Sequence, residues 1–203
     1  IPPAIEEELK AKRCEIINCT CPFVVKIHEI VRNAYEHGKN ILLVGDRNHP
    51  EVLGINGECA DSATIIENIE DLDLIPNTDK PTIVVAQTTY SFNKYDKICE
   101  ILKKKIANLE IFDTICITTE NRQREAEKLA ARSDMMIVIG SKESSNTKKL
   151  FDICSSRCRE TYLVEYPREL DEILKRDEIR SYRIGITAGA STPGPPAARW
   201  RRA

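Results

Sequence analysis

The regular alternation of short apolar runs with longer amphipathic stretches constrains this chain more than any other feature. Apolar runs such as NILLVG (40–45) and TIVVAQ (82–87) have the length and composition of buried strands. The stretches between them, among them 22–38 and 92–109, place apolar residues at helical spacing. Repeated β-then-α units with apolar strands predict parallel sheets covered by helices, and therefore an α/β fold.

The same patterns predict the less obvious elements. We expect a helix over 3–13 (PAIEEELKAKR), a strand over 14–18 (CEIIN) and an extended segment over 110–117 (EIFDTICI). Gly38 is expected to end the helix that begins at Pro22, because glycine commonly follows the last helical turn. The basic, Pro- and Ala-rich segment 194–203 lacks periodicity, and we expect it to be disordered or unrelated to the fold.

Charge and hydropathy limit the classes of partner. Charged residues make up 31% of the 203 residues, yet the formal net charge is only −2, and the two signs interleave along the helical stretches. This balance predicts no nucleic-acid partner. No apolar run approaches the roughly 18 residues of a membrane span, and no charged-then-apolar leader begins the sequence. We therefore expect a cytoplasmic protein with no membrane partner.

Eight cysteines are a high count for such a protein, and in a reducing cytosol they are not expected to form disulfides. Most are expected to be small apolar core residues, among them Cys14, Cys99 and Cys154. Cys59 and Cys158 lie at the ends of predicted elements, and the sequence assigns them no role.

Ligands of open parallel sheets gather at the carboxyl ends of the strands. The segments that leave the predicted strands are rich in Ser, Thr, Asn, Gln, His and Cys; they are INCTCP (17–22), GDRNHPE (45–51), AQTTYS (86–91), ICITTENRQ (115–123), GSKESSN (140–146) and ITAGAS (186–191). Capping a helix needs one side chain, whereas 87–89 and 144–146 each offer three. The surplus predicts a ligand that accepts many hydrogen bonds.

A phosphate or diphosphate fits this pattern, because exposed N–H groups and the dipole of a helix N-terminus attract anions. The common nucleotide-binding motifs G-x-x-x-x-G-K-[ST] and G-x-G-x-x-G are absent from the sequence. His49 could add a positive charge at one strand end, although a lone loop histidine is more often a surface residue. Glu51, two residues later, is also typical of a first helical turn.

Two thiols at strand ends suggest a metal centre. Cys21 precedes Pro22, and proline favours the first helical position, so Cys21 is the expected N-cap. A helix N-terminus favours the thiolate, which is the form that binds metals. Cys116 ends another predicted strand, but an iron–sulfur cluster is normally held by four cysteines. A zinc site from Cys19, Cys21, Cys116 and a histidine is an alternative, although the spacing fits no standard zinc pattern.

Six phrases together carry a resemblance to a known family. They are TCPFVVKIHEIV (20–31), HPEVLG (49–54), AQTTYSF (86–92), NRQ (121–123), GSKESSNTKKL (140–150) and GITAGAST (185–192). In this order, and over roughly residues 1–193, the chain resembles the LytB-type 4-hydroxy-3-methylbut-2-enyl diphosphate reductases.

The resemblance implies a fold and domain boundaries. The family has three α/β lobes in a pseudo-threefold (trefoil) arrangement, and each lobe gives one cysteine to a central [4Fe-4S] cluster. Residues 1–20 would be a remnant of the first lobe, 21–112 the second lobe and 113–193 the third, with 194–203 as an unrelated or disordered tail.

The resemblance also implies an activity and the residues that perform it. The enzyme reductively removes the hydroxyl of 4-hydroxy-3-methylbut-2-enyl diphosphate, giving isopentenyl and dimethylallyl diphosphate in the last step of the non-mevalonate pathway. A ferredoxin or flavodoxin would supply the electrons. The implied cluster ligands are Cys21 and Cys116, the implied catalytic residues are Glu51 and Thr88, and the implied substrate-binding residues are His49, Gln87, Ser144, Ser145, Asn146 and Ser191.

The sequence departs from the family pattern at both ends. The family's Gly-Phe-Cys phrase, which holds the first cluster ligand, is absent, and the tail replaces the expected C-terminal helix. We therefore expect a fragment that cannot hold a normal cluster and is inactive alone. The alternative function is a non-redox α/β domain that binds a phosphate ligand, or one of the sugar-phosphate isomerase type.

Overall fold

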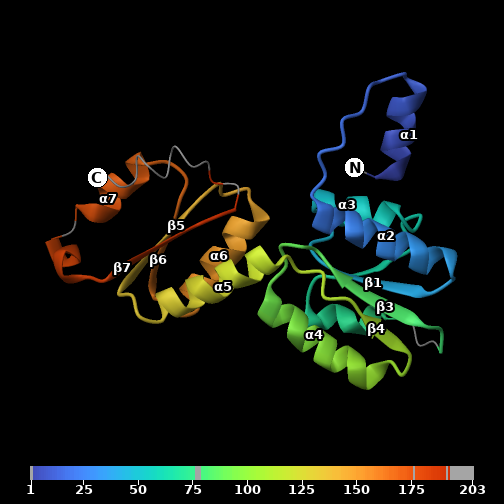
Figure 1. Cartoon of the computed structure of the whole chain (residues 1–203). Helices are drawn as coiled ribbons and strands as arrows, with labels where there is room; N and C mark the ends of the chain where they lie inside the picture. Colours follow the sequence, from blue (N-terminus) through green and yellow to red (C-terminus); the bar gives the residue numbers. More distant parts are fainter. Residues whose placement is uncertain (1, 76–78, 176, 191, 193–203) are drawn as a thin grey trace. The chain divides into compact units, whose positions relative to one another are not determined.

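The computed structural model describes residues 2–75, 79–175, 177–190 and 192, and the chain divides into two compact units (Figure 1). Unit 1 is Ile1–Cys116 and unit 2 is Ile117–Ala203. Both units contain parallel strands with helices between them, so the predicted α/β class is confirmed. The predicted division at 112/113 lies four residues before the division between the units.

Unit 1 is built on a four-stranded parallel sheet with the strand order β2-β1-β3-β4. Its elements in chain order are α1 (Pro3–Ala11), α2 (Pro22–Glu36), β1 (Asn40–Val44), α3 (Pro50–Gly57), β2 (Thr64–Ile66), the 3-10 helix η1 (Ile69–Leu74), β3 (Thr82–Ala86), α4 (Phe92–Lys105) and β4 (Leu109–Ile111). The central strands β1 and β3 pair along their full lengths, from Asn40 opposite Thr82 to Val44 opposite Ala86.

Alternate strand residues of unit 1 face two separate cores. Leu42 and Val84 pack with α4 and η1 on one face of the sheet, whereas Leu43 and Val85 pack with α2 and α3 on the other. Figure 1 shows α4 and the α2–α3 pair on opposite sides of this sheet. Because both faces are covered, the strands are apolar throughout, which explains why they are readable as continuous apolar runs.

Unit 2 is built on a three-stranded parallel sheet with the strand order β6-β5-β7. Its elements are α5 (Ile117–Ala130), β5 (Met135–Ile139), α6 (Ser145–Ser155), β6 (Glu160–Val164), α7 (Arg168–Leu174), the 3-10 helix η2 (Asp177–Ser181) and β7 (Ile184–Ala188). Met136 and Val138 of the central strand pack against α5 and α6, whereas Ile137 and Ile139 face α7.

The predicted strand over 14–18 is wrong. These residues are irregular, and the side chain of Ile17 is 80% exposed. Cys14, predicted to be a core residue, is also exposed, and the first helix ends at Ala11 rather than residue 13. In the described part of the chain, 14–18 pairs with no strand of either sheet, and an apolar run without a partner strand cannot satisfy its backbone groups as a strand.

The other elements follow the sequence closely. Cys21 is the residue before Pro22, the first residue of α2, and Gly38 adopts a positive φ of 67° just after that helix ends. Of the extended segment predicted over 110–117, only the first two residues belong to β4 and the last begins α5. Segment 194–203 lies outside the described residues, so the expectation for the tail stays a prediction.

Contacts of Glu58 with Arg32 and His28 fix α2 against the end of α3. The Glu58 carboxylate, whose side chain is 6% exposed, accepts from Nε and Nη2 of Arg32 at 2.9 and 2.7 Å. His28 Nδ1 lies 2.8 Å from the other carboxylate oxygen. His28 therefore has a structural partner in Glu58.

The cysteines differ in their burial. The buried ones are Cys59, Cys99, Cys154 and Cys158; Cys116 is half-buried, and Cys19 and Cys21 are exposed.

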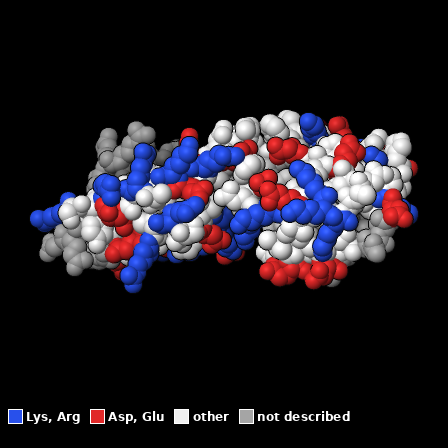
Figure 2. Space-filling view, turned by 90° about the horizontal axis from the view of Figure 1, so that it is seen from below, with Lys and Arg blue, Asp and Glu red and all other residues white. Residues whose placement is uncertain are grey.

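The surface carries charges of both signs. Figure 2 shows Lys and Arg side chains interspersed with Asp and Glu side chains on the face it presents. No helix in the described part of the chain is long and apolar enough to cross a membrane.

Candidate functional site

Thr88 holds the carboxylate of Glu51 from two sides. The main-chain N–H of Thr88 donates to Glu51 Oε1 over 2.6 Å, and Thr88 Oγ1 donates to Oε2 over 2.8 Å. Glu51 lies in the first turn of α3 and Thr88 follows β3, so the two residues come from neighbouring βα units. The structure thus brings together the two residues that the sequence assigned to catalysis.

His49 is the N-cap of α3. Its Nδ1 accepts a hydrogen bond from the main-chain N–H of Glu51 over 3.1 Å, which fixes the ring at the start of the helix. This contact requires the tautomer with an unprotonated Nδ1, and Nε2 is then the ring N–H. His49 and Glu51 are therefore positioned by the same helical turn.

Gln87 is fully buried between two loops. Its Oε1 accepts from the main-chain N–H of Asp46 over 3.0 Å, and its Nε2 donates to Thr89 Oγ1 over 2.9 Å. Gly45 makes room for this side chain, because a Cβ at that position would lie 3.0 Å from the Cβ of Gln87 and 2.6 Å from Val52 Cγ2. Much of the surplus of hydrogen-bonding side chains predicted at 87–89 is therefore bonded to other residues of the chain.

Cys116 is held next to the same loop. Its main-chain N–H donates to the carbonyl oxygen of Thr88 over 3.0 Å. Two residues earlier, the buried Thr114 Oγ1 accepts from Ala86 N over 2.7 Å and donates to Ala86 O over 2.8 Å. Thr114 thus continues the contact between the two strands beyond the end of β4 and directs the chain toward Cys116.

Cys21 lies at the same edge of the unit 1 sheet. α2 packs on the sheet and leads through the short turn at Gly38 directly into β1, so it runs antiparallel to β1 and its N-terminus lies at the edge where β1 and β3 end. Cys21 precedes α2, and Cys116 precedes α5 after β4. Neither forms a disulfide; Cys21 is exposed and Cys116 is half-buried. Within the described residues, no group of three His, Cys, Asp or Glu side chains is placed to hold a metal, so the zinc alternative gains no support.

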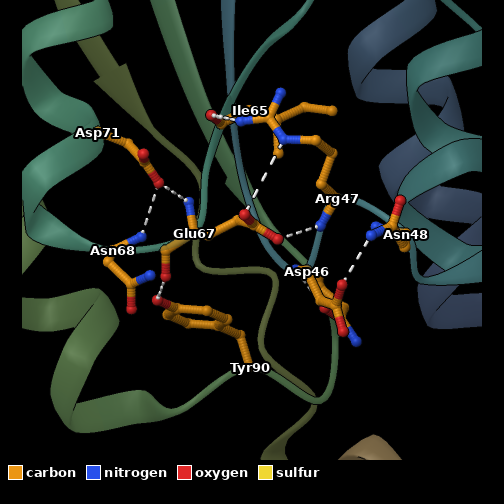
Figure 3. Close-up of polar contacts among 9 residues, drawn as sticks. Asp46, Arg47, Asn48, Ile65, Glu67, Asn68, Asp71 and Tyr90 are labelled. Carbon is orange, nitrogen blue, oxygen red and sulfur yellow. Dashed lines mark hydrogen bonds and ion pairs between the residues drawn. The ribbon is translucent and has the colours of Figure 1, made fainter.

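A hydrogen-bond network supports the turn that leads to His49 (Figure 3). Arg47 N donates to Glu67 Oε1 over 2.8 Å, and Asn48 N donates to Asp46 Oδ1 over 3.1 Å. On the other side, Tyr90 donates its phenolic O–H to the carbonyl of Glu67 over 2.5 Å.

The environment of Tyr90 changes its acidity. Burial, followed by the nearby carboxylates of Asp71 and Glu67, raises the pKa of Tyr90 to about 12. The residue therefore stays a neutral donor to Glu67 over the physiological range. It contributes a fixed hydrogen bond beneath the turn that carries His49.

Unit 2 has a polar cluster of its own at the N-terminus of α6. Ser144 is the N-cap, and its Oγ accepts from Thr147 N over 3.4 Å. Asn146 is 6% exposed, yet its amide nitrogen and oxygen have no hydrogen-bond partner in the described part of the chain. Thr147 Oγ1 is likewise buried and unpartnered. Ser145 is half-buried at the first helical position, and the predicted site residue Ser191 lies outside the described residues.

Two glycines allow the strand ends of unit 2 to close around Thr147. A Cβ on Gly189 would lie 2.3 Å from Thr147 Oγ1, and one on Gly140 would lie 2.7 Å from it. Gly140 also has φ of 151°, which favours glycine. Buried polar groups without partners are rare in folded proteins and commonly mark a bound water, ion or ligand. Within the described residues, the Asn146 amide of the triplet 144–146 therefore remains unpartnered, in contrast to the Gln87 amide of 87–89.

Sequence reasoning missed Thr114 and Thr147. Thr114 lies in a segment predicted to be extended, where a threonine is an ordinary strand residue. Thr147 directly follows the quoted triplet 144–146, and the helical pattern around it gives no sign that its hydroxyl is buried. Only the pairing of the strands and the position of the glycines give these residues a place in the site.

The sequence profile described as "LytB protein" matches residues 1–197. This chain belongs to the LytB family. The LytB resemblance predicted from the six phrases is therefore confirmed. A relative in Caldanaerobacter subterraneus subsp. tengcongensis named 4-hydroxy-3-methylbut-2-enyl diphosphate reductase is 46% identical over 188 residues, which are 92% of this chain and 64% of the relative. A Clostridium perfringens protein of the same name is 43% identical over 190 residues, which are 94% of this chain and 66% of the relative.

Solved LytB-type structures agree with the fold. The E-1-hydroxy-2-methyl-but-2-enyl-4-diphosphate reductase of Plasmodium falciparum matches with a TM-score of 0.91 and 33% identity, over 99% of this chain and 63% of that one. A second structure, of an (E)-4-hydroxy-3-methyl-but-2-enyl diphosphate reductase, matches with a TM-score of 0.63 and 34% identity, over 99% and 71%. The present LytB chain spans less than two thirds of the length of the curated relatives described above.

Proposed function

We propose that this chain forms part of a 4-hydroxy-3-methylbut-2-enyl diphosphate reductase, an oxidoreductase that yields isopentenyl and dimethylallyl diphosphate. The observation that carries the proposal is the contact set of Thr88. This residue bonds the Glu51 carboxylate through its N–H and hydroxyl, and the main chain of Cys116 through its carbonyl. Thr88 thus holds the proposed proton donor and the main chain of the residue that carries the proposed metal-binding thiol, and a reductive dehydroxylation needs both groups close together.

The residues present fit part of an iron–sulfur site. Cys21 and Cys116 lie at one edge of one sheet and form no disulfide, and thiolates are the usual ligands of such clusters. The proposed [4Fe-4S] cluster has three protein ligands, of which the third is not in this sequence. When bound, the cluster would supply the two electrons of the reaction and a Lewis-acidic iron.

The remaining chemistry belongs to the side chains. Reductive dehydroxylation breaks one C–O bond, consumes two electrons and two protons, and releases the hydroxyl as water. Glu51 is the proposed proton donor, since a carboxyl group within reach of a leaving hydroxyl acts as a general acid. Thr88 holds both oxygens of that carboxyl group and presents its own hydroxyl beside it. Their joint role is to hold a proton close to the reacting oxygen.

The diphosphate is assigned to the N-terminus of α6. Asn146 offers a buried amide without a partner, and Ser144 and Ser145 lie at the start of the same helix. Backbone N–H groups at a helix N-terminus attract anions, and an anion there would satisfy the Asn146 amide nitrogen. The roles of His49, which has Nε2 as its ring N–H, and of Ser191 in substrate binding stay predictions.

The proposal includes the cellular setting. An allylic diphosphate is the small-molecule substrate, and the two electrons come from a donor protein, for which a ferredoxin or flavodoxin is the expected class. We place the reaction in the cytoplasm, with no nucleic-acid or membrane partner.

The decisive experiment supplies the missing ligand. The N-terminal part of the Caldanaerobacter relative, which is expected to hold the first cluster ligand of the family, is joined ahead of Ile1 and the protein is reconstituted anaerobically with iron and sulfide. We expect a brown protein that consumes the allylic diphosphate with reduced methyl viologen. Cys21→Ala and Cys116→Ala should each lower bound iron and abolish turnover. Cys59→Ala, which changes a buried thiol away from this edge, is the matched control and should retain both.

The alternative, a non-redox phosphate-binding domain, predicts a different pattern. Inorganic diphosphate would then perturb the Asn146 side-chain amide signals in a nuclear magnetic resonance spectrum, whereas Cys21→Ala and Cys116→Ala would leave bound iron unchanged from the parent. Such a result would remove the reductase proposal and keep the anion site.

A further inference from the structure

We infer that Gln87 is a positioning residue that sets the geometry of Glu51 and Thr88, rather than a residue that binds the substrate. The inference rests on the proposed function, because it concerns the two residues assigned to proton delivery. It replaces the role that the family resemblance implied for Gln87 with one that the contacts of its side chain support.

Burial and bonding of the side chain carry the first step. Gln87 has no exposed surface, and its carbonyl and amino ends are both engaged, with Asp46 N at 3.0 Å and Thr89 Oγ1 at 2.9 Å. To contact a substrate it would have to give up these bonds and leave the Asp46 N–H without its acceptor. A buried donor without an acceptor is costly, so the side chain is expected to stay between the loops.

The position of these bonds carries the second step. Pairing of β1 with β3 ends at Val44 and Ala86, and the last main-chain bond runs from Gln87 N to Val44 O over 2.8 Å. Beyond that point the two loops would separate. The side chain of Gln87 joins them again, and it does so between the loop that leads to Glu51 and the loop that contains Thr88.

The contact between Glu51 and Thr88 depends on the distance between these two loops. The Thr88 N–H to Glu51 Oε1 distance is 2.6 Å, so a small separation of the loops would break the bond. Proton transfer needs donor and acceptor within hydrogen-bond reach, and misplacement by about 1 Å can lower a rate by about a hundredfold. Gln87 therefore acts on the chemistry through distance, without contact to the reacting atoms.

The first test uses the chain as it is. Gln87→Leu keeps the size of the side chain and removes both bonds, and Thr89→Val removes one of them at a half-buried position. We expect the Thr88 amide proton to exchange with solvent about tenfold faster in Gln87→Leu, relative to the Val84 amide of the same sample. Thr89→Val should give a smaller change in the same direction. Gln87→Glu, which retains an acceptor for Asp46 N and accepts from the Thr89 hydroxyl, should restore the parent ratio.

Thr82→Val is the matched control for this test. Thr82 is also buried on β3, but its Oγ1 donates to Lys80 O at the opposite end of the strand. Thr82→Val should raise the exchange rates of the Thr88 and Val84 amide protons by the same factor. If Gln87→Leu or Thr89→Val does the same, Gln87 contributes only to general stability and the inference is wrong.

The second test separates positioning from binding in the joined, reconstituted enzyme. Gln87→Leu should lower kcat by about tenfold to a hundredfold and leave KM within about twofold, because the geometry of proton delivery changes and substrate contacts do not. A raised KM with unchanged kcat would instead assign Gln87 to the substrate. If the parent enzyme shows no turnover, the proposed function fails, while the exchange ratio of Thr88 to Val84 still decides the role of Gln87 in the loops.

Discussion

The main-chain N–H of Cys116 donates a hydrogen bond to the carbonyl oxygen of Thr88 over 3.0 Å. Because the N–H and hydroxyl of Thr88 both bind Glu51, three polar groups of one residue connect a thiol-bearing loop with a carboxylate. These connections lie within unit 1 and need no ligand to form. The proton-donating part of the proposed site is therefore built by the fold itself.

Two substitutions of Glu51 should separate the contribution of its hydrogen bonds to stability from that of its charge. Glu51→Gln can keep both bonds to Thr88, since the amide nitrogen donates to Thr88 Oγ1 once the hydroxyl turns, and we expect stability to change by less than about 1 kcal/mol. Glu51→Ala leaves two donors without acceptors and should cost about 2–3 kcal/mol. Urea unfolding followed by circular dichroism measures both. Glu110→Ala removes only an exposed partner of Lys39 and serves as the control. Equal losses for Glu51→Gln and Glu51→Ala would contradict the bonding described.

Two buried asparagines should respond oppositely to the same substitution. Asn56 Oδ1 accepts from Ala63 N over 3.1 Å, whereas both amide atoms of Asn146 lack partners among the residues that the structure describes. Asn56→Leu should therefore destabilise the chain by about 1–3 kcal/mol, whereas Asn146→Leu should be neutral or stabilising by about 1 kcal/mol.

The measurements for the asparagines are urea unfolding and titration with inorganic diphosphate. Asn146→Leu should weaken binding of inorganic diphosphate while it preserves or raises stability. A destabilised Asn146→Leu chain would mean that the amide has partners in solution, and would remove the main support for an anion site on α6.

The stability of unit 1 should fall at alkaline pH. The pKa of Tyr90 is raised to about 12 by burial, whereas an unfolded chain has its tyrosine pKa near 10. The unfolded chain therefore loses the proton first, and the stability present below pH 10 is lost as the pH rises through about 12. The full loss is about 2–3 kcal/mol.

The Tyr90→Phe variant tests this assignment. It removes the titrating group together with its bond to Glu67 O, so it should be less stable near pH 8 and should lose less on going from pH 8 to 11.5. The pKa of Tyr95 is also raised by burial, so Tyr95→Phe should flatten the curve independently. Urea unfolding at a series of pH values measures the slope, and an unchanged slope in both variants would contradict the proposed cause.

Thiol reactivity should fall into three classes. Cys14, Cys19 and Cys21 are exposed and should react at once with a disulfide reagent in the folded chain, whereas the half-buried Cys116 should react more slowly. The four buried thiols should react only after unfolding, and burial raises the pKa of Cys154 to about 11. Counting released thiolate before and after addition of urea measures the classes. Cys154→Ala should remove one thiol from the last class alone.

The order of helices and strands could be predicted from the sequence because burial on both faces of a parallel sheet leaves an unmistakable apolar run. Thr82–Ala86 and Met135–Ile139 are such runs. The segment 14–18 has similar composition, but strand formation requires a neighbour, and a single sequence does not say which segments pair. Composition alone therefore gave a strand where the described structure has none.

The sequence indicates where candidate residues lie but not which partners they have. Loops at strand ends pointed to Cys116, whereas the roles of Glu51 and Thr88 came from the resemblance to the LytB family, and all three roles stay predictions. Whether a polar side chain faces a ligand or another loop depends on which atoms lie opposite it. Gln87 and Asn146 come from similar triplets, and only the structure separates the bonded amide from the unpaired one.

The unequal donors of Thr88 have one more consequence. A main-chain N–H can only give a hydrogen bond, whereas a hydroxyl can give or receive one. When Glu51 is protonated, its proton is therefore expected on Oε2, which then donates to Thr88 Oγ1. The hydroxyl hydrogen of Thr88 has to rotate away from Glu51 to accept this bond. The orientation of the Thr88 hydroxyl would therefore indicate whether Glu51 is protonated or deprotonated.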